Sequence, residues 1–253
     1  MSTVPTRFRL GRFARSAIVV AALVTGSLAV SAVPASAVPA SGTGCAAAHV
    51  IAARGSNEPA GPGRLGPLVS AIQNGVGAPV SASSVSYPAS ALFYSWSTTQ
   101  GDAAIKKMLT VQVTKCPTQA IVLVGFSQGA QLVGDVLSGG GGAAGLGSST
   151  PPAAADVTDN VVAAIQMADP RHVANVSINV GTGNPYNGLF PRTRTQNSVL
   201  INGFSAVVRS YCDAGDPYCA RGRTSSVHDA VVGKYSADAL AFTLGRLSLV
   251  GVR

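Results

Sequence analysis

The chain has 253 residues, of which 47% are hydrophobic and 11% are charged, and its formal net charge at pH 7 is +8. Four of these charges belong to arginines before residue 16, and the remaining +4 is scattered, which excludes the clustered basic surface of a nucleic-acid-binding protein. The apolar content is sufficient for the core of one domain of ordinary size. The low charge suits a protein that works against an uncharged or apolar surface, although any alanine- and glycine-rich secreted protein would share it.

The first 37 residues are predicted to be a secretory signal peptide. Their arginines form a basic start, residues 17–33 are apolar, and Ala35-Ser36-Ala37 has the pattern of a cleavage site. A membrane anchor is the alternative, but Pro34 favours cleavage, and no later stretch reaches the roughly 18 consecutive apolar residues of a membrane span. We therefore expect a secreted, extracellular domain over residues 38–253, with no integral membrane span after cleavage.

The cysteine count also fits secretion. Four cysteines follow the predicted cleavage site, which in a secreted chain indicates two disulfides, and four cysteines allow three pairings. The short spacing of Cys212 and Cys219 makes them natural partners, which leaves Cys45 to pair with Cys116. Zinc binding is the alternative, but two cysteines separated by six residues, with no nearby histidine, have poor ligand spacing.

The domain is expected to begin with a strand at residues 48–53, a turn at residues 54–58 and a helix at residues 65–76. A backbone N–H in a turn between a strand and a helix can stabilise an oxyanion, so this turn is a candidate oxyanion donor. Ser56 is the candidate, through its backbone N–H and its hydroxyl. From this stretch alone, however, a serine that caps a helix or stabilises a turn is the better interpretation.

The next segments predict a parallel sheet. Residues 83–87 and 120–124 have strand patterns, and residues 103–113 between them have helical spacing. This alternation predicts an α/β fold with right-handed crossovers. Trp96, the single tryptophan, falls in the loop before the helix and is interpreted as a packing residue rather than a substrate platform.

A nucleophile elbow is predicted at Gly125-Phe126-Ser127-Gln128-Gly129, between the strand at residues 120–124 and a helix at residues 128–137. The serine of such an elbow has strained dihedrals, and small residues on both sides let the backbone pass. The backbone N–H of Gln128 then points at the space above the serine, where the helix adds positive dipole. Ser127 is therefore the candidate nucleophile.

Beyond the elbow helix, residues 139–155 are rich in glycine, serine and proline, and we predict a mobile surface loop. A buried strand is expected at residues 160–167, ahead of Asp169.

His228 is the candidate general base. It follows Ser127 and several aspartates in the order nucleophile, acid, base that is typical of α/β-hydrolases, and it precedes a helix expected at residues 236–247. The other histidines fit less well, because His49 lies in the first strand and His172 has no following helix to set its position.

The acid has four candidates. Asp169 follows a strand, as the acid does in many hydrolases, whereas Asp213, Asp216 and Asp229 all lie near His228 in the sequence. A carboxylate on a covalently clamped loop orients an imidazole better than a free one does, which favours Asp216.

Taken together, these motifs resemble the cutinase family of secreted serine esterases from about Cys45 to Leu247. The residues that carry the resemblance are Cys45 with Cys116, the ARGSNE motif of residues 53–58, the GFSQG motif of residues 125–129, Cys212-x-x-Gly215-Asp216-x-x-Cys219 and His228. The resemblance implies a three-layer α/β-hydrolase sandwich with a central parallel sheet of five strands, an open active site and no lid. It also implies that Ser127, Asp216 and His228 form the catalytic triad and that Ser56 and the Gln128 backbone form the oxyanion hole, and it supports the cysteine pairing.

The expected function is hydrolysis of carboxylic esters through an acyl-enzyme on Ser127, with cutin, polyesters or short-to-medium acyl esters as substrates presented at an apolar or polymeric surface. An acetylxylan esterase is the alternative within enzymes, and a secreted binding protein that has lost catalysis is the alternative of another class. No metal or organic cofactor is implied, because three histidines at unrelated spacings make no metal site. We expect a monomer that binds no nucleic acid.

Overall fold

The computed structural model describes residues 44–253, so the predicted signal peptide lies outside the described residues. The helices and strands, in chain order, are β1 (Ala48–Ala53), a 3-10 helix (Gly63–Leu65), α1 (Gly66–Asn74), β2 (Val80–Ser84), α2 (Tyr94–Lys115), β3 (Ala120–Phe126), α3 (Gln128–Ser138), α4 (Ala155–Thr158), β4 (Val161–Met167), β5 (Asn179–Val180), α5 (Arg194–Phe204), β6 (Val208–Tyr211) and α6 (Ser225–Leu249).

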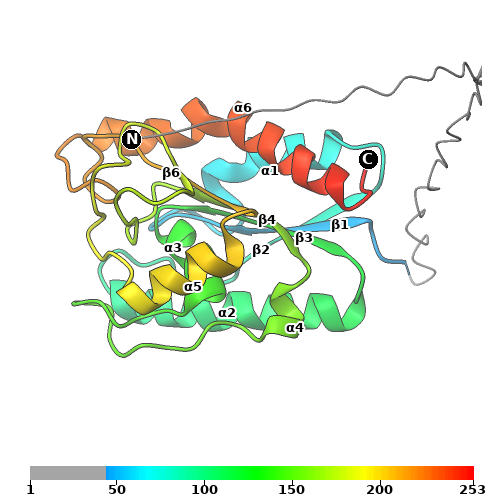
Figure 1. The fold of residues 1–253 in the computed structure, drawn as a ribbon, viewed down its shortest axis with the longest axis horizontal. Helices are drawn as coiled ribbons and strands as arrows, with labels where there is room; N and C mark the ends of the chain where they lie inside the picture. Colours follow the sequence, from blue (N-terminus) through cyan, green and yellow to red (C-terminus); the bar gives the residue numbers. More distant parts are fainter. Residues whose placement is uncertain (1–43) are drawn as a thin grey trace, which may run out of the picture. The chain divides into compact units, whose positions relative to one another are not determined.

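The strands form one parallel sheet in the order β2-β1-β3-β4-β6-β5. Helices α1 and α6 cover one face, and α2, α3, α4 and α5 cover the other (Figure 1). The predicted three-layer α/β sandwich is therefore confirmed.

Each face of the sheet has its own apolar layer, because successive strand residues point to opposite faces. In β3, Val122 and Val124 pack with α1 and α6, whereas Ile121 and Leu123 pack with α2 and α3. All seven residues of β3 are buried, as expected for a central parallel strand that is covered on both faces.

The predicted number of five strands is wrong, since the described part of the sheet has six. The additional edge strand, β5, contains two residues, which pair with Ser210 and Tyr211 of β6. A two-residue strand has no alternation that a sequence pattern could reveal.

Three elements begin at least three residues earlier than predicted. Strand β2 occupies residues 80–84 instead of 83–87, α2 begins at residue 94 instead of 103, and α6 begins at residue 225 instead of 236. The first turns of α2 contain serine, threonine and glycine, which have modest helix propensity, but a Cβ atom at Gly101 would overlap Leu132 of α3. Close packing against α3 therefore outweighs propensity.

The earlier start of α2 changes the interpretation of Trp96. This residue lies within the first turn of α2, so its assignment to a loop is wrong, and it is 55% exposed, which does not fit a packing residue.

The glycine-rich segment after α3 is only partly on the surface. Gly139 and Gly140 are buried, and Gly140 exchanges two backbone hydrogen bonds with Thr150 at 3.2 and 3.0 Å. The carbonyl of Gly140 also accepts a hydrogen bond from Gln196 Nε2 at 2.9 Å. The beginning of this segment is thus attached to α5. Within residues 44–253, no helix is sufficiently long and apolar to span a membrane.

Candidate active site

Ser127 lies in a sharp turn between β3 and α3. Its φ of +52° and ψ of −118° are strained for a residue with a side chain, at a cost of about 1–3 kcal/mol. A Cβ atom at Gly125 would overlap the backbone of Gly129, and one at Gly129 would overlap the backbone of Ala53. Glycine is therefore required at both positions, and the turn lifts the serine hydroxyl to the carboxyl end of the sheet.

His228 contacts Ser127 across 101 residues of sequence. The imidazole Nε2 lies 3.0 Å from Ser127 Oγ, and Nδ1 lies 2.8 Å from Asp216 Oδ2. The rings of Phe126 and Tyr218 pack against the imidazole, with centroids 4.9 and 4.5 Å away. His228 belongs to the first turn of α6 rather than to a loop before a helix, so the helix fixes its backbone.

Asp216 is fully buried, and the backbone around it satisfies its second oxygen. Oδ1 accepts hydrogen bonds from the N–H groups of Tyr218 at 2.7 Å and Cys219 at 3.0 Å. The Cys212–Cys219 disulfide closes this loop, and the structure also contains the Cys45–Cys116 disulfide. With its other oxygen held in this way, Asp216 directs Oδ2 at His228.

The other three aspartates proposed as the acid have different partners. Their carboxylates form ion pairs with cations away from the imidazole: Asp169 with Arg192 at 2.5 Å, Asp213 with Lys234 at 2.5 Å, and Asp229 with Arg64 at 3.0 Å. The structure therefore brings Asp216, and none of these three, into contact with His228.

The other two histidines do not reach Ser127. His49 hydrogen-bonds Ser81 and Ser83 of β2 at 2.7 and 2.8 Å, and burial lowers its pKa. His172 lies 3.2 Å from Ser210 Oγ, and burial lowers its pKa as well. Burial therefore favours the neutral form of both imidazoles.

The two predicted oxyanion residues flank the serine. Ser56 lines the same cavity as Ser127, and Gln128 is the first residue of α3, whose N–H has no partner within the helix. The side chain of Gln128 is held by two hydrogen bonds: Oε1 accepts from Ser97 Oγ at 3.0 Å, and Nε2 donates to the Ser90 carbonyl at 3.1 Å.

Arg54 holds the loop that carries Ser56, a role that the sequence analysis did not identify. Its guanidinium donates to the carbonyls of Val85 at 3.2 Å, Tyr87 at 2.7 Å and Glu58 at 2.9 Å. The Tyr87 hydroxyl in turn donates to the Arg54 carbonyl at 2.6 Å, and burial raises the pKa of that phenol. These bonds fix the path of the chain on both sides of Ser56.

The cavity above Ser127 has a volume of about 500 Å³, which is within the usual range for small-molecule sites. Besides His228, its lining includes seven apolar or aromatic side chains: Ala91, Tyr94, Phe126, Pro170, Leu189, Phe190 and Tyr218. Next to it, Leu92 and Phe93 are 84% and 63% exposed. The site therefore opens beside an apolar surface.

A buried network of charges supports the wall of this cavity, and sequence patterns did not reveal it. Arg171 binds Asp135 at 2.8 Å, and Arg192 binds Asp169 at 2.5 Å, with all four side chains almost fully buried. Burial raises the pKa of Asp135 to about 6, although the two arginines oppose this shift. The network connects α3 to the segment that contains Pro170 and Phe190.

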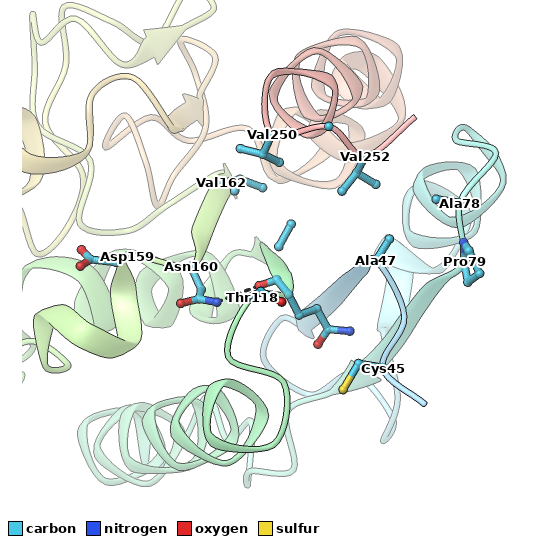
Figure 2. A pocket seen from close by; sticks show the side chains of 13 residues that line it. Cys45, Ala47, Ala78, Pro79, Thr118, Asp159, Asn160, Val162, Val250 and Val252 are labelled. Atoms are coloured by element: carbon cyan, nitrogen blue, oxygen red, sulfur yellow. Dashed lines mark hydrogen bonds between the residues drawn. The ribbon is translucent and has the colours of Figure 1, made fainter. Parts of the chain in front are cut away.

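A second cavity of about 560 Å³ lies at the opposite end of the sheet, where β1, β3 and β4 begin. Figure 2 shows Val250 and Val252 on one side of it and Cys45 on the other. Its lining contains no histidine or serine, so the Ser127–His228 pair of the first cavity has no counterpart there. Among residues 44–253, no group of three histidine, cysteine or acidic side chains is placed to hold a metal ion.

The serine lies in a nucleophile elbow at the carboxyl end of a parallel sheet and contacts a histidine, which in turn contacts an aspartate. This arrangement, with the chain order serine, aspartate, histidine, defines the α/β-hydrolase class. Residues 44–247 match the Cutinase family, and the chain belongs to that family, as its motifs indicated.

Several relatives cover most of the chain. Cutinase 11 of Verticillium dahliae is 33% identical over 82% of this chain and 71% of its own length. Acetylxylan esterase 2 of Talaromyces purpureogenus is 33% identical over 80% of this chain and 88% of its own length. The solved catalytic core domain of acetyl xylan esterase from Trichoderma reesei has a TM-score of 0.72 at 32% identity and covers 80% of this chain and 99% of that domain.

Proposed function

We propose that the protein is a secreted serine hydrolase of carboxylic esters. The observation that supports this function best is the contact series from Ser127 through His228 to Asp216, with lengths of 3.0 and 2.8 Å, at the cavity of a chain in the Cutinase family. In this proposal Ser127 is the nucleophile, His228 the general base and Asp216 the acid that orients it.

The reaction proceeds in two steps. Ser127 Oγ attacks the ester carbonyl carbon while His228 Nε2 takes its proton, and the imidazolium then protonates the departing alcohol, which leaves an acyl group on the serine. In the second step, His228 takes a proton from water, and the water oxygen attacks the acyl carbon. The imidazolium then returns the proton to Ser127 Oγ as the carboxylic acid product leaves. Asp216 stabilises the imidazolium in both steps.

The negative charge on the carbonyl oxygen needs donors that are in place before the reaction. We assign this role to the backbone N–H of Gln128, helped by the positive end of α3, and to the N–H and hydroxyl of Ser56. Loss of one such donor typically reduces kcat about 100- to 1,000-fold.

The substrates that we propose are cutin, polyesters or short-to-medium acyl esters. The apolar cavity lining and the exposed Leu92 and Phe93 beside it favour an ester presented at an apolar surface. Removal of acetyl groups from xylan is the second candidate, because a relative and a solved structure named acetylxylan esterase match most of the chain. Secretion after cleavage of residues 1–37 fits the two disulfides.

The test is hydrolysis of p-nitrophenyl esters from acetate to palmitate, together with acetylated xylan and a polyester film. We expect activity on butyrate or longer chains and on the film, and a loss of at least about 1,000-fold in Ser127→Ala. Ser70→Ala is the control, because Ser70 is exposed on α1. Activity confined to acetyl groups would instead support the acetylxylan esterase, and no activity with intact disulfides would support a binding protein.

A further inference from the structure

Three charged side chains form a bridge across the rim of the active-site cavity, and the ester mechanism leaves them unused. Arg64 lies at the centre, with Nε 3.1 Å from Glu58 Oε1 and Nη1 3.0 Å from Asp229 Oδ1. Arg64 Nη1 also donates to the Asp229 carbonyl at 3.2 Å. Arg64 and Asp229 are 165 residues apart in sequence, so the bridge joins the segment after β1 to the first turn of α6.

One end of the bridge holds the loop of Ser56. Glu58 Oε2 accepts the N–H of Gly55, the residue directly before Ser56, at 2.6 Å, and Oε1 accepts the N–H of Arg64 at 3.0 Å. A Cβ atom at Gly63 would overlap the Glu58 carboxylate, so this glycine leaves the space that the carboxylate fills. Glu58 thus connects Arg64 to the backbone of Gly55, next to the proposed oxyanion donor.

The other end of the bridge lies beside the proposed base. Asp229 directly follows His228 in the first turn of α6. The guanidinium of Arg64 also covers the ring of Phe126 at 4.5 Å, and that ring packs against the His228 imidazole at 4.9 Å. Arg64 therefore contacts Phe126, the residue before the proposed nucleophile. It also contacts the two segments that carry the proposed oxyanion donor Ser56 and the proposed base His228.

We propose that Arg64 is a positioning residue that aligns the oxyanion loop with the nucleophile and the base. This inference rests on the proposed esterase function. The side chains of Arg64 and Asp229 are 36% and 62% exposed, and an exposed ion pair of this kind contributes little to folding stability, whereas Glu58 is only 13% exposed. The bridge instead affects turnover, because small displacements of catalytic groups reduce the rate strongly.

The test compares Arg64→Met, Asp229→Ala and the double variant with wild type. Methionine keeps an unbranched side chain over Phe126 and removes both ion pairs. We expect kcat on p-nitrophenyl butyrate, read on the plateau of the pH profile, to fall about tenfold in Arg64→Met, with KM changed less than about twofold. Asp229→Ala removes one carboxylate, so its loss is about threefold, and the double variant loses no more than Arg64→Met because both changes break one bridge.

Arg209→Met is the matched control. Arg209 covers the ring of Phe242 at 4.4 Å, as Arg64 covers Phe126, but it does not line the cavity. This variant should keep wild-type kcat, and the thermal midpoint of Asp229→Ala should stay within about 4 °C of wild type, as expected for an exposed ion pair worth less than about 1 kcal/mol.

Four results would overturn the role of Arg64. These are an unchanged kcat in Arg64→Met, a raised KM with unchanged kcat, an equal loss of kcat in Arg209→Met, and losses that multiply fully in the double variant. A failure of the esterase function is distinct, because wild type itself would then neither turn over the ester nor react with a fluorophosphonate, and the inference would fall with it.

Discussion

At the scale of single residues, the site depends on where two neighbouring carboxylates point. Asp216 turns Oδ2 toward His228, whereas Asp213, on the same disulfide-closed loop, faces Thr182, Lys234 and Tyr235. The position of Asp216 on a covalently clamped loop favoured it as the acid, but Asp213 lies on the same loop. Only the backbone contacts of Oδ1 with Tyr218 and Cys219 explain why Asp216 is the one that is aimed at the imidazole.

Replacement of these two aspartates separates their roles. In Asp216→Asn we expect kcat to fall about 10,000-fold, because the amide donates to Nδ1 and favours the wrong tautomer of His228. Asp213→Asn, the control on the same loop, should keep kcat within about twofold. Comparable losses in both variants, measured on p-nitrophenyl butyrate at pH 8, would mean that Asp216 acts only through the shape of the loop.

Asp213 should instead affect acid stability. Burial raises the pKa of Asp213, but hydrogen bonds from Lys234, Tyr235 and Thr182 outweigh it and lower the pKa to about 2. Since the folded pKa is below the unfolded value, the carboxylate stabilises the fold above about pH 4, and this contribution is lost as the pH falls toward 2. Urea unfolding should show Asp213→Asn about 1–2 kcal/mol less stable than wild type at pH 6 and nearly equal near pH 2. A difference that is constant with pH would contradict this linkage.

At the scale of secondary-structure elements, the sequence indicated the central elements well and their ends less well. β1, β3 and β4 are apolar runs, and α3 follows a glycine-flanked serine, so local pattern was sufficient. The first turns of α2 and α6 contain serine and other residues of modest helix propensity, which local pattern does not mark as helical. β5 exists only through its pairing with β6, which is not visible in two residues of sequence.

The two disulfides should have different effects because they close different elements. Cys45–Cys116 spans 71 residues and Cys212–Cys219 spans 7, so loop entropy predicts losses of about 4 and 2 kcal/mol on replacement by serine pairs. Only the second pair encloses Asp216. Its removal should reduce kcat at temperatures where the protein is still folded, whereas removal of the first should lower the thermal midpoint with kcat nearly unchanged. The reverse pattern would contradict the role given to the clamped loop.

At the scale of the whole domain, the fold class and the residues in contact at the site could be predicted, because a motif marks each of them. The partners that hold these residues in place could not be predicted. Arg64 and Asp229 are 165 residues apart, and Arg171 and Asp135 are 36 apart, with no spacing that marks them as pairs. Such contacts arise only when the fold brings distant segments together.

The most direct test of the central claim is mass spectrometry of the folded protein after reaction with a fluorophosphonate. We predict one adduct, mapped to the peptide that contains Ser127, with none in Ser127→Ala and none after denaturation. An adduct on another residue, or no adduct on folded protein with both disulfides intact, would contradict the assignment of Ser127 as an activated nucleophile.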